Sequence, residues 1–376
     1  MTTTAQVLND TLRTGVLYMA MELSQSKWHL AFGTGNKMRQ VVIEASNTIA
    51  LQEEIRKAKE KFRLQPEAKV ISCYEAGRDG FWIHRYLETT HIKNYVIDSS
   101  SIKVNRKSRR AKTDRLDVEK LLKQLISHAR GEEKLQVARV PSEAEEDRRR
   151  MHRERERLKK ERTAHTNRIK SLLNLQGIKC KGKKKWKTYL DNIMDWKGNL
   201  LPAFLKEELL REVDRLEMVE KQLKELEASM LGQLKTSEDP AFIKIQQLMN
   251  LKGIGEVSSW VLIMEWFGWR QFNNRREVGA AAGLVGTPYD SGESQREQGI
   301  TKAGNSRIRA LMIELGWSWL RYQPDSDLSK WFDKRFNQSK RSRKVGIVAL
   351  ARKLLIAIWR YISAGELPKG ARLKAC

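Results

Sequence analysis

The stretch from Ser142 to Gln176 consists almost entirely of helix-forming residues. Charged side chains are dense along it, and its apolar stripe is limited to Leu158, Ile169 and Leu172. A helix that is polar around most of its surface cannot be buried in a globular core. The stretch therefore predicts a long exposed helix, which Pro141 separates from the preceding part of the chain.

Before Pro141, short β-rich runs alternate with runs of helical spacing. The predicted strands are Val16–Leu23, Trp28–Phe32, Arg39–Ala45, Ala68–Tyr74 and Tyr95–Asp98, and the predicted helices are Thr48–Phe62 and Asp114–His128. This alternation is typical of an α/β domain.

Apolar residues at heptad spacing appear after the long helix. They are Leu205, Leu209, Leu216, Val219, Leu223, Leu226 and Met230, interrupted by Glu212. A coiled coil, within the chain or between chains, and an amphipathic helix packed on its own domain explain the pattern equally well. After Pro240 we expect a mainly helical domain with a glycine-rich middle, Gly279–Gly304. The predicted fold class is α/β plus α, with domains at residues 1–140, 141–240 and 241–376.

The chain carries many more basic than acidic residues. Its 376 residues include 72 Lys and Arg against 46 Asp and Glu, a formal charge of +26. A polyanion such as nucleic acid would neutralise this charge. No uncharged apolar run reaches the ~18 residues of a membrane span, and no apolar segment follows the N terminus, so we expect no membrane partner and no secretion. The 3 separated cysteines argue against disulfides or zinc and favour the reducing cytoplasm.

Four acidic residues are candidate metal ligands. Glu22 and Glu75 stand at the ends of predicted strands, whereas Asp114 and Asp117 lie three apart on one face of a predicted helix. Carboxylates bind Mg²⁺ or Mn²⁺, and two ions ~3.5–4 Å apart can stabilise both reacting oxygens in phosphoryl transfer. Taken singly, each residue could instead be a helix-capping or surface acid.

Two basic clusters are candidate contacts to a phosphate backbone. The first precedes the helix at Asp114 and contains Lys103, Arg106, Lys107, Arg109, Arg110, Lys112 and Arg115; the second contains Lys179, Lys181, Lys183, Lys184, Lys185 and Lys187. Solvated loops are the alternative explanation for both clusters.

The last third of the chain contains further candidate sites. Gly253 and Gly255 form a helix-hairpin-helix-like turn that could present backbone N–H groups to a phosphate, although a plain helix-turn-helix looks similar. Ser291 stands in a predicted loop, where it could act as a nucleophile if a base and positive charge assist it. Most Ser-Gly pairs are simply turns. A predicted phosphate-binding helix entry comprises Lys302, Asn305, Arg307 and Arg309.

In this order, the motifs resemble the "one-ten" family of bacterial insertion-sequence transposases, which are bridge-RNA-guided recombinases. The resemblance extends from about Val16 to about Tyr361. It implies an RNase H/RuvC-like domain with a metal-binding DEDD tetrad, a coiled-coil insert and a helical transposase domain with a serine nucleophile. Ser291 falls on the serine position, and Glu22, Glu75, Asp114 and Asp117 fall on the four acid positions. The family usually has Asp at the first position, and the extra methylene of Glu22 moves the carboxylate by about one bond.

The resemblance also implies partners. A structured RNA from the element's end would pair with donor and target DNA, and the basic helices from Arg148 to Lys187 would contact RNA and DNA backbones. The coiled coil would assemble a homodimer, with two dimers forming a tetramer in the synaptic complex. A composite site with Ser291 would form a covalent link to DNA, and the protein would act at the bacterial nucleoid.

Two other classes of protein remain open on the residues alone. A metal-dependent nuclease, such as a junction-resolving enzyme, would need the acids but not Ser291. A non-catalytic RNA- or DNA-binding protein would need neither, and its affinity would fall steeply with salt.

Overall fold

The computed structural model describes residues 15–35, 37–77, 80–97, 114–180, 186–291 and 294–374, with only the backbone described at residues 114, 288–291 and 294–298. The chain divides into two units, Met1–Pro141 and Ser142–Cys376, each of which is described by itself. No helix in these described ranges is long and apolar enough to cross a membrane.

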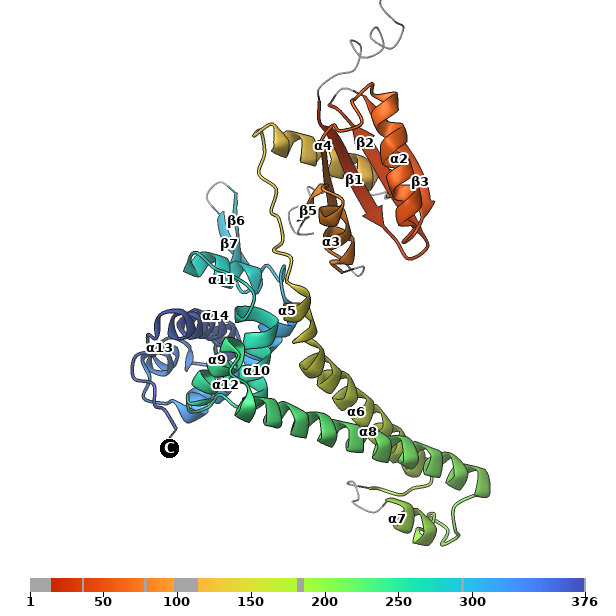
Figure 1. Cartoon of the computed structure of the whole chain (residues 1–376). Helices are drawn as coiled ribbons and strands as arrows, with labels where there is room; N and C mark the ends of the chain where they lie inside the picture. Colours follow the sequence, from red (N-terminus) through yellow and green to blue (C-terminus); the bar gives the residue numbers. More distant parts are fainter. Residues whose placement is uncertain are drawn as a thin grey trace, which may run out of the picture. The chain divides into compact units, whose positions relative to one another are not determined.

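A five-stranded mixed sheet forms the centre of the first unit (Figure 1). Its strands are β1 (Leu17–Leu23), β2 (Lys27–Gly33), β3 (Met38–Glu44), β4 (Val70–Glu75) and β5 (Lys93–Ile97), in the order β3-β2-β1-β4-β5. The pairs β1–β4 and β4–β5 are parallel, whereas β1–β2 and β2–β3 are antiparallel. All five strands predicted from the sequence are confirmed.

Helices cover both faces of this sheet. The helices α2 (Thr48–Lys61) and α3 (Trp82–Thr89) share a core with Met19 and Met21 on one face. The helix α4 (Asp114–Ala129) packs on the other face against Ala20, Ala31 and Cys73. These small side chains allow α4 to approach the strands closely. The sequence predicted α2 and α4 but missed α3.

The second unit begins with a pair of long helices (Figure 1). We call this pair the arm. Its first helix is α6 (Arg150–Leu175), which follows the short α5 (Glu143–Asp147). It pairs with α8 (Ala203–Thr236), and the small helix α7 (Trp186–Asn192) lies between them in the sequence. The predicted long helix from Ser142 is therefore confirmed, except that it is interrupted between α5 and α6.

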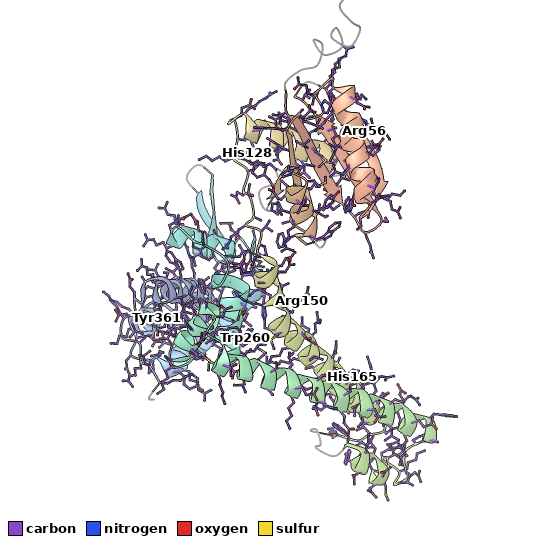
Figure 2. The ribbon with its side chains drawn as sticks, viewed as in Figure 1. Arg56, His128, Arg150, His165, Trp260 and Tyr361 are labelled. Atoms are coloured by element: carbon purple, nitrogen blue, oxygen red, sulfur yellow. The ribbon has the colours of Figure 1, made fainter. Side chains whose placement is uncertain are left out.

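The apolar seam of α8 is buried against α6 of the same chain. Leu216 shares a cluster with Ile169, and Leu223 shares one with Leu158. Helix pairing within the chain thus accounts for the heptad pattern. Glu212 does not break the pairing, because its nearly buried carboxylate lies 2.7 Å from Nδ1 of His165 on α6. Figure 2 labels His165 on this helix.

The rest of this unit is a helical domain with one β-hairpin. Its helices are α9 (Pro240–Met249), α10 (Glu256–Leu262), a π-helical turn (Ile263–Phe267), α11 (Arg275–Ala281), α12 (Ser306–Tyr322), α13 (Asp327–Phe336) and α14 (Lys340–Ala364). Trp260, Trp266 and Trp319 are buried in its core. The hairpin consists of β6 (Gly286–Ser291) and β7 (Ser294–Ile300), where the sequence had predicted a loop. That prediction was wrong because the glycines were interpreted as loop residues. The two strands are separated by only two residues, the first of them Gly292, and such a short connection is typical of a β-hairpin.

Candidate active site

Glu22 and Glu75 lie at the carboxyl ends of neighbouring parallel strands. The register of β1 and β4 pairs Ala20 with Cys73 and Met21 with Tyr74. Continuing this register by one residue brings Glu22 beside Glu75, at the inter-strand spacing of about 4.8 Å. Both glutamates lie on the face that α4 covers, because side chains alternate along a strand and Ala20 and Cys73 face α4.

Helix α4 is oriented so that its first turn approaches this end of the sheet. Leu122 in the middle of α4 and Ile126 nearer its C-terminal end lie 3.3 and 3.9 Å from the position that a Cβ on Gly33 would occupy, and Gly33 pairs with the beginning of β1. The helix axis rises about 1.5 Å per residue towards Asp117 and Asp114. The first turn of α4 therefore lies towards the end of β1.

An open groove of about 510 Å³ supports this orientation. Arg115 and Glu119 of α4 line it together with His29 of β2, and His29 is the cross-strand partner of Glu22. Asp117 itself is partly buried, and its Oδ1 accepts a hydrogen bond from Lys120 Nζ at 3.0 Å. The topology thus places Glu22 beside Glu75 at one end of one sheet face and directs the first turn of α4 towards that end.

The chemistry of this acid set fits a hard divalent cation, since all four residues supply carboxylate oxygens. Among the side chains that the structure describes, no group of three His, Cys, Asp or Glu residues is close enough to hold a metal ion. The side chain of Asp114 is not among those described. Glu22 and Glu75 each have an interaction partner in this structure.

Both predicted basic clusters lie largely outside the described residues. This applies to Arg106, Lys107, Arg109, Arg110 and Lys112 in the first cluster, and to Lys183, Lys184 and Lys185 in the second. Their predicted phosphate contacts stay predictions.

Ser291 is the last residue of β6, directly opposite Ser294 at the start of β7. The base of the hairpin is fixed by backbone contacts, with Thr301 N donating to Val285 O at 2.9 Å. Gly283 and Gly304 both have positive φ angles, and a Cβ on either residue would overlap a backbone carbonyl of the opposite segment. Glycine is therefore required where these two segments cross.

The predicted phosphate-binding helix entry holds the hairpin base in place. Asn305 caps α12 by accepting hydrogen bonds from Arg307 N and Ile308 N, at 3.0 and 3.1 Å. Arg309 donates to the carbonyls of Ala282 and Lys302. Arg307 pairs with Glu156 of α6 at 2.6 Å. Asn305, Arg307 and Arg309 thus all have structural partners inside this unit, whereas Lys302 is exposed.

A buried glutamate beside this helix entry was missed by the sequence analysis. Glu265 lies on the π-helical turn, and such turns are frequent at functional sites. Its carboxylate accepts two hydrogen bonds from Arg153, at 2.7 and 3.0 Å, and lies 2.9 Å from His152 Nε2. Burial acts to raise the pKa of Glu265, but the hydrogen bonds from His152 and Arg153 outweigh it and hold this pKa well below its usual range. The sequence feature that could have indicated this buried glutamate is a single Glu within the otherwise apolar run Trp260–Phe267.

The glycines of the hairpin-like turn between α9 and α10 have different roles. Gly253 has φ +92°, and a Cβ there would lie 3.1 Å from Tyr322 Cβ, so a close approach to α12 requires glycine. Gly255 is the N-cap of α10 in an extended conformation. The C-terminal segment also packs on this turn, because Lys374 N donates to Asn250 O at 2.7 Å.

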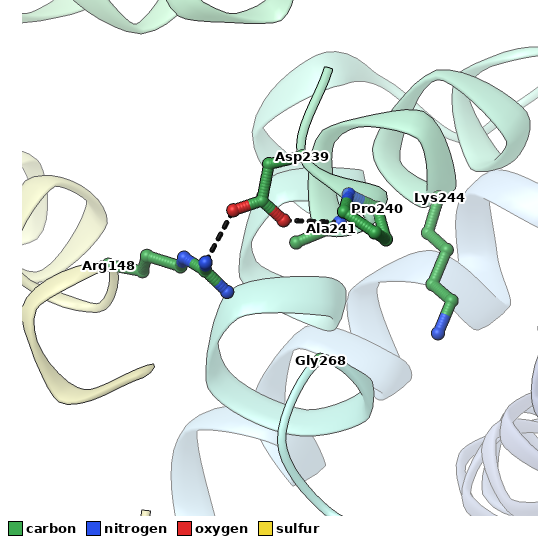
Figure 3. A pocket seen from close by; sticks show the side chains of 6 residues that line it. All are labelled: Arg148, Asp239, Pro240, Ala241, Lys244 and Gly268. Atoms are coloured by element: carbon green, nitrogen blue, oxygen red, sulfur yellow. Dashed lines mark hydrogen bonds and ion pairs between the residues drawn. The ribbon is translucent and has the colours of Figure 1, made fainter. Parts of the chain in front are cut away.

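A surface pocket of about 440 Å³ lies at the start of α9 (Figure 3). Arg148 forms an ion pair with Asp239 there, and Asp239 caps α9 by accepting a hydrogen bond from Ala241 N. These contacts join the segment between α5 and α6 to the helical domain.

Comparison with known proteins identifies the class of enzyme. A DEDD transposase family model of the IS110 type matches residues 13–177, and the model described as "Transposase IS116/IS110/IS902 family" matches residues 245–329. A Sinorhizobium fredii protein named as transposase y4rJ is 40% identical over 377 residues, covering 96% of this chain and 95% of that protein. The transposase for insertion sequence element IS1111A from Coxiella burnetii is 26% identical over 213 residues, or 56% of this chain and 57% of that protein.

These matches define a transposase, an enzyme that cleaves and recombines DNA. The chain belongs to the IS110/IS116 family of insertion-sequence transposases. The family resemblance inferred from the sequence motifs is confirmed.

Proposed function

We propose that this transposase excises and inserts its element with an acidic metal site and a serine nucleophile. The observation that carries the proposal is the β1–β4 register, which brings Glu22 beside Glu75 on the face covered by α4. Asp114 and Asp117 stand in the first turn of that helix. The strand order and the helix placement also support a ribonuclease-H-like, RuvC-like fold for this unit.

Glu22, Glu75, Asp114 and Asp117 would hold Mg²⁺ or Mn²⁺. When bound there, the cation supplies positive charge that stabilises the extra negative charge of a phosphate undergoing substitution. Ser291 would be the attacking group. Its Oγ forms a bond to phosphorus, one phosphodiester P–O bond breaks, and the departing oxygen takes up a proton to become a free hydroxyl group. Attack of another strand's hydroxyl on the serine-linked phosphate then joins the new strands and restores the serine.

The hairpin supports this role for Ser291. A residue at the end of a strand beside a two-residue connection lies next to the tip of the hairpin. The base of the hairpin is anchored by Gly283, Gly304 and the Asn305 cap. A nucleophile on a firmly anchored hairpin loses little conformational entropy when it is oriented for attack.

The partners follow from the same proposal. We propose that donor and target DNA are selected by a structured RNA encoded at the element's end, so that base pairing rather than the protein reads the sequence. Phosphate contacts would come from the basic cluster before α4, from the lysine cluster before α7, and from Gly253, Gly255 and Lys302. The protein would act in the bacterial cytoplasm as a dimer that forms a tetramer in the synaptic complex. Because α6 already covers the apolar seam of α8, other surfaces would form the dimer.

A recombination assay in bacterial cells tests this mechanism. The wild-type chain is expressed beside its native flanking DNA, and circular junctions are detected by sequencing. Ser291→Ala and Asp117→Asn should both abolish junctions, since the first removes the nucleophile and the second removes a carboxylate charge. Ser294→Ala and Glu132→Gln are matched controls, because one changes the serine opposite Ser291 and the other an exposed acid shortly after α4.

A second readout separates this mechanism from its rivals. Wild type should form a protein–DNA adduct that resists denaturant, and Ser291→Ala should form none. If Ser291→Ala still recombines while Asp117→Asn does not, the serine assignment is wrong and a metal-only mechanism replaces it. If neither substitution affects recombination, both site assignments fail.

A further inference from the structure

The end of the arm that lies away from the helical domain exposes several large apolar side chains. We define the arm tip as residues 168–180 and 186–206, which contain the end of α6, α7 and the start of α8. Trp196 is 73% exposed and Phe204 is 86% exposed, and Leu175, Met194 and Leu200 are also exposed. Single exposed apolar residues are common, but several together usually mark a binding surface.

Trp196 is held on a rigid turn. The Asp195 carboxylate accepts hydrogen bonds from Lys197 N and Asn199 N at 2.8 and 2.9 Å. Asp195 N donates to Asn199 O at 2.8 Å, and Trp196 N donates to Gln176 O at 3.2 Å. The backbone that carries Trp196 is therefore held in place before any partner binds, which reduces the entropy cost of binding.

The surroundings of Trp196 combine a close backbone approach with a cation. A Cβ on Gly177 would lie only 3.0 Å from Trp196 Cβ, so glycine allows the chain to support the base of the side chain. Lys197 Nζ lies 4.9 Å from the ring centre. An exposed aromatic ring beside a cation is the arrangement that binds nucleic-acid bases by stacking.

The charge of this region favours a polyanion. The described residues of the arm tip contain six Lys and Arg and two Asp, a net charge of +4, whereas α8 contains six Lys and Arg and eight Asp and Glu, a net charge of −2. The arm tip therefore carries a net positive charge. A second copy bound through the same surface would place two such patches against each other, and like charges across an interface are unfavourable.

We propose that the arm tip is a stacking platform for unpaired RNA bases, with Trp196 as its central residue. This rests on the RNA partner in the proposed function. Bases inside a duplex are stacked on their neighbours, whereas bases in RNA loops are exposed and can stack on aromatic side chains. The platform adds recognition of an unpaired segment to the phosphate contacts that basic residues make.

The test measures the affinity of the full-length chain for a labelled RNA hairpin whose loop has about 12 unpaired adenosines. Trp196→Ala should weaken loop binding roughly 5- to 150-fold, the range that corresponds to loss of one base–aromatic stack. Binding to an RNA duplex of equal length should not change. Trp196→Phe should retain most of the affinity, and Leu231→Ala is a matched control because it removes an exposed apolar side chain of α8 outside the tip.

Salt dependence gives an independent readout. Trp196→Ala removes no charge, so the slope of log affinity against log salt should be unchanged. Lys197→Ala should reduce this slope by about 0.7, the value expected for one lost phosphate contact on a single strand. Circular dichroism of each variant checks that the fold is retained.

Several outcomes would overturn the proposal. Unchanged loop binding in Trp196→Ala, equal losses on loop and duplex, or a loss confined to single-stranded DNA each refute an RNA-base platform. A change of oligomeric mass in Trp196→Ala with intact RNA binding would assign the surface to a second copy. Because binding is measured without strand cleavage, Ser291→Ala should bind the loop normally, which separates failure of the platform from failure of the catalytic proposal.

Discussion

Glu265 provides the most sensitive test of how α6 is attached to the helical domain. Its side chain is only 4% exposed, and it contacts both His152 and Arg153 of α6. Asn305 Nδ2 also lies 3.4 Å from Oε1, which extends the network to the N-cap of α12. Glu265→Gln preserves the shape of the side chain and removes only its charge.

The expected cost can be worked out from these contacts. The two hydrogen bonds from Arg153 are charge-assisted and bidentate, and each such bond contributes about 1.5–3 kcal/mol. Complete removal of one partner of a buried ion pair costs about 3–5 kcal/mol. Because the Gln oxygen can still accept a hydrogen bond, we expect Glu265→Gln to lower the free energy of unfolding of this unit by about 2–4 kcal/mol.

The direction of the pKa shift of Glu265 also predicts how the free energy of unfolding changes with pH. The pKa of Glu265 is depressed in the folded state, so its contribution to stability is fully present above the ordinary carboxyl pKa of 4.5. This contribution is lost as the pH falls below that value, towards the lower folded pKa, because the unfolded chain takes up a proton first. In Glu265→Gln, this part of the acid dependence should disappear.

Urea unfolding should be followed by hydrogen exchange of peptides from α6 and α10, because the two units of the chain need not unfold together. Glu161→Gln is the matched control, since it is an exposed glutamate on α6. A loss below about 0.5 kcal/mol in Glu265→Gln, the range of ordinary surface substitutions, would refute the reasoning. An unchanged acid dependence would show that the carboxylate is not held charged by its partners.

Two further predictions concern backbone and thiol environments. Gly304→Ala should destabilise the helical domain by more than about 3 kcal/mol, because its Cβ would overlap the Ala281 carbonyl oxygen. The control Gly299→Ala should cost about 1 kcal/mol, because Gly299 has φ +88° but no described atom lies within 4 Å of its Cβ position. Comparable losses of thermal stability in the two variants would contradict this prediction. Burial raises the pKa of the Cys73 thiol far above its ordinary value. A thiol-alkylating reagent should therefore label the half-buried Cys180 in the native protein but label Cys73 only after unfolding. Mass spectrometry of the labelled peptides measures both.

The sequence predicted the five strands of the sheet and the helix that begins at Asp114. Short β-rich runs and the helical spacing after Asp114 were sufficient for this, because residue type and periodicity indicate strands and helices. The short helix α3 was missed because it has only 8 residues, too few for a clear periodic signal. The position of Glu22 beside Glu75 needed the strand register, which depends on long-range pairing that a single sequence does not show.

The second unit was harder to predict for a physical reason. Its polar residues are explained by partners far away in the sequence, as with Glu265 and Arg153, or with Glu212 and His165. A buried glutamate and an exposed one look the same in a sequence until their partners are known. Glu212 was therefore interpreted as a break in the α8 seam, although the structure shows it joining α8 to α6.

The same contacts change how the net charge of the chain should be interpreted. Several arginines near the start of α6 are paired within the unit: Arg148 with Asp239, Arg153 with Glu265, and Arg155 with Glu227. A paired arginine releases few counterions when a phosphate approaches, because its charge is already balanced. The sequence treated the whole stretch from Arg148 to Lys187 as nucleic-acid contacts. Arg168, Lys187 and Lys206 of the arm tip are ion-paired as well. The structure instead directs that expectation to exposed basic residues of the tip such as Lys179 and Lys197. The salt dependence of RNA binding should accordingly change more when Lys179 or Lys197 is replaced than when Arg153 or Arg155 is replaced.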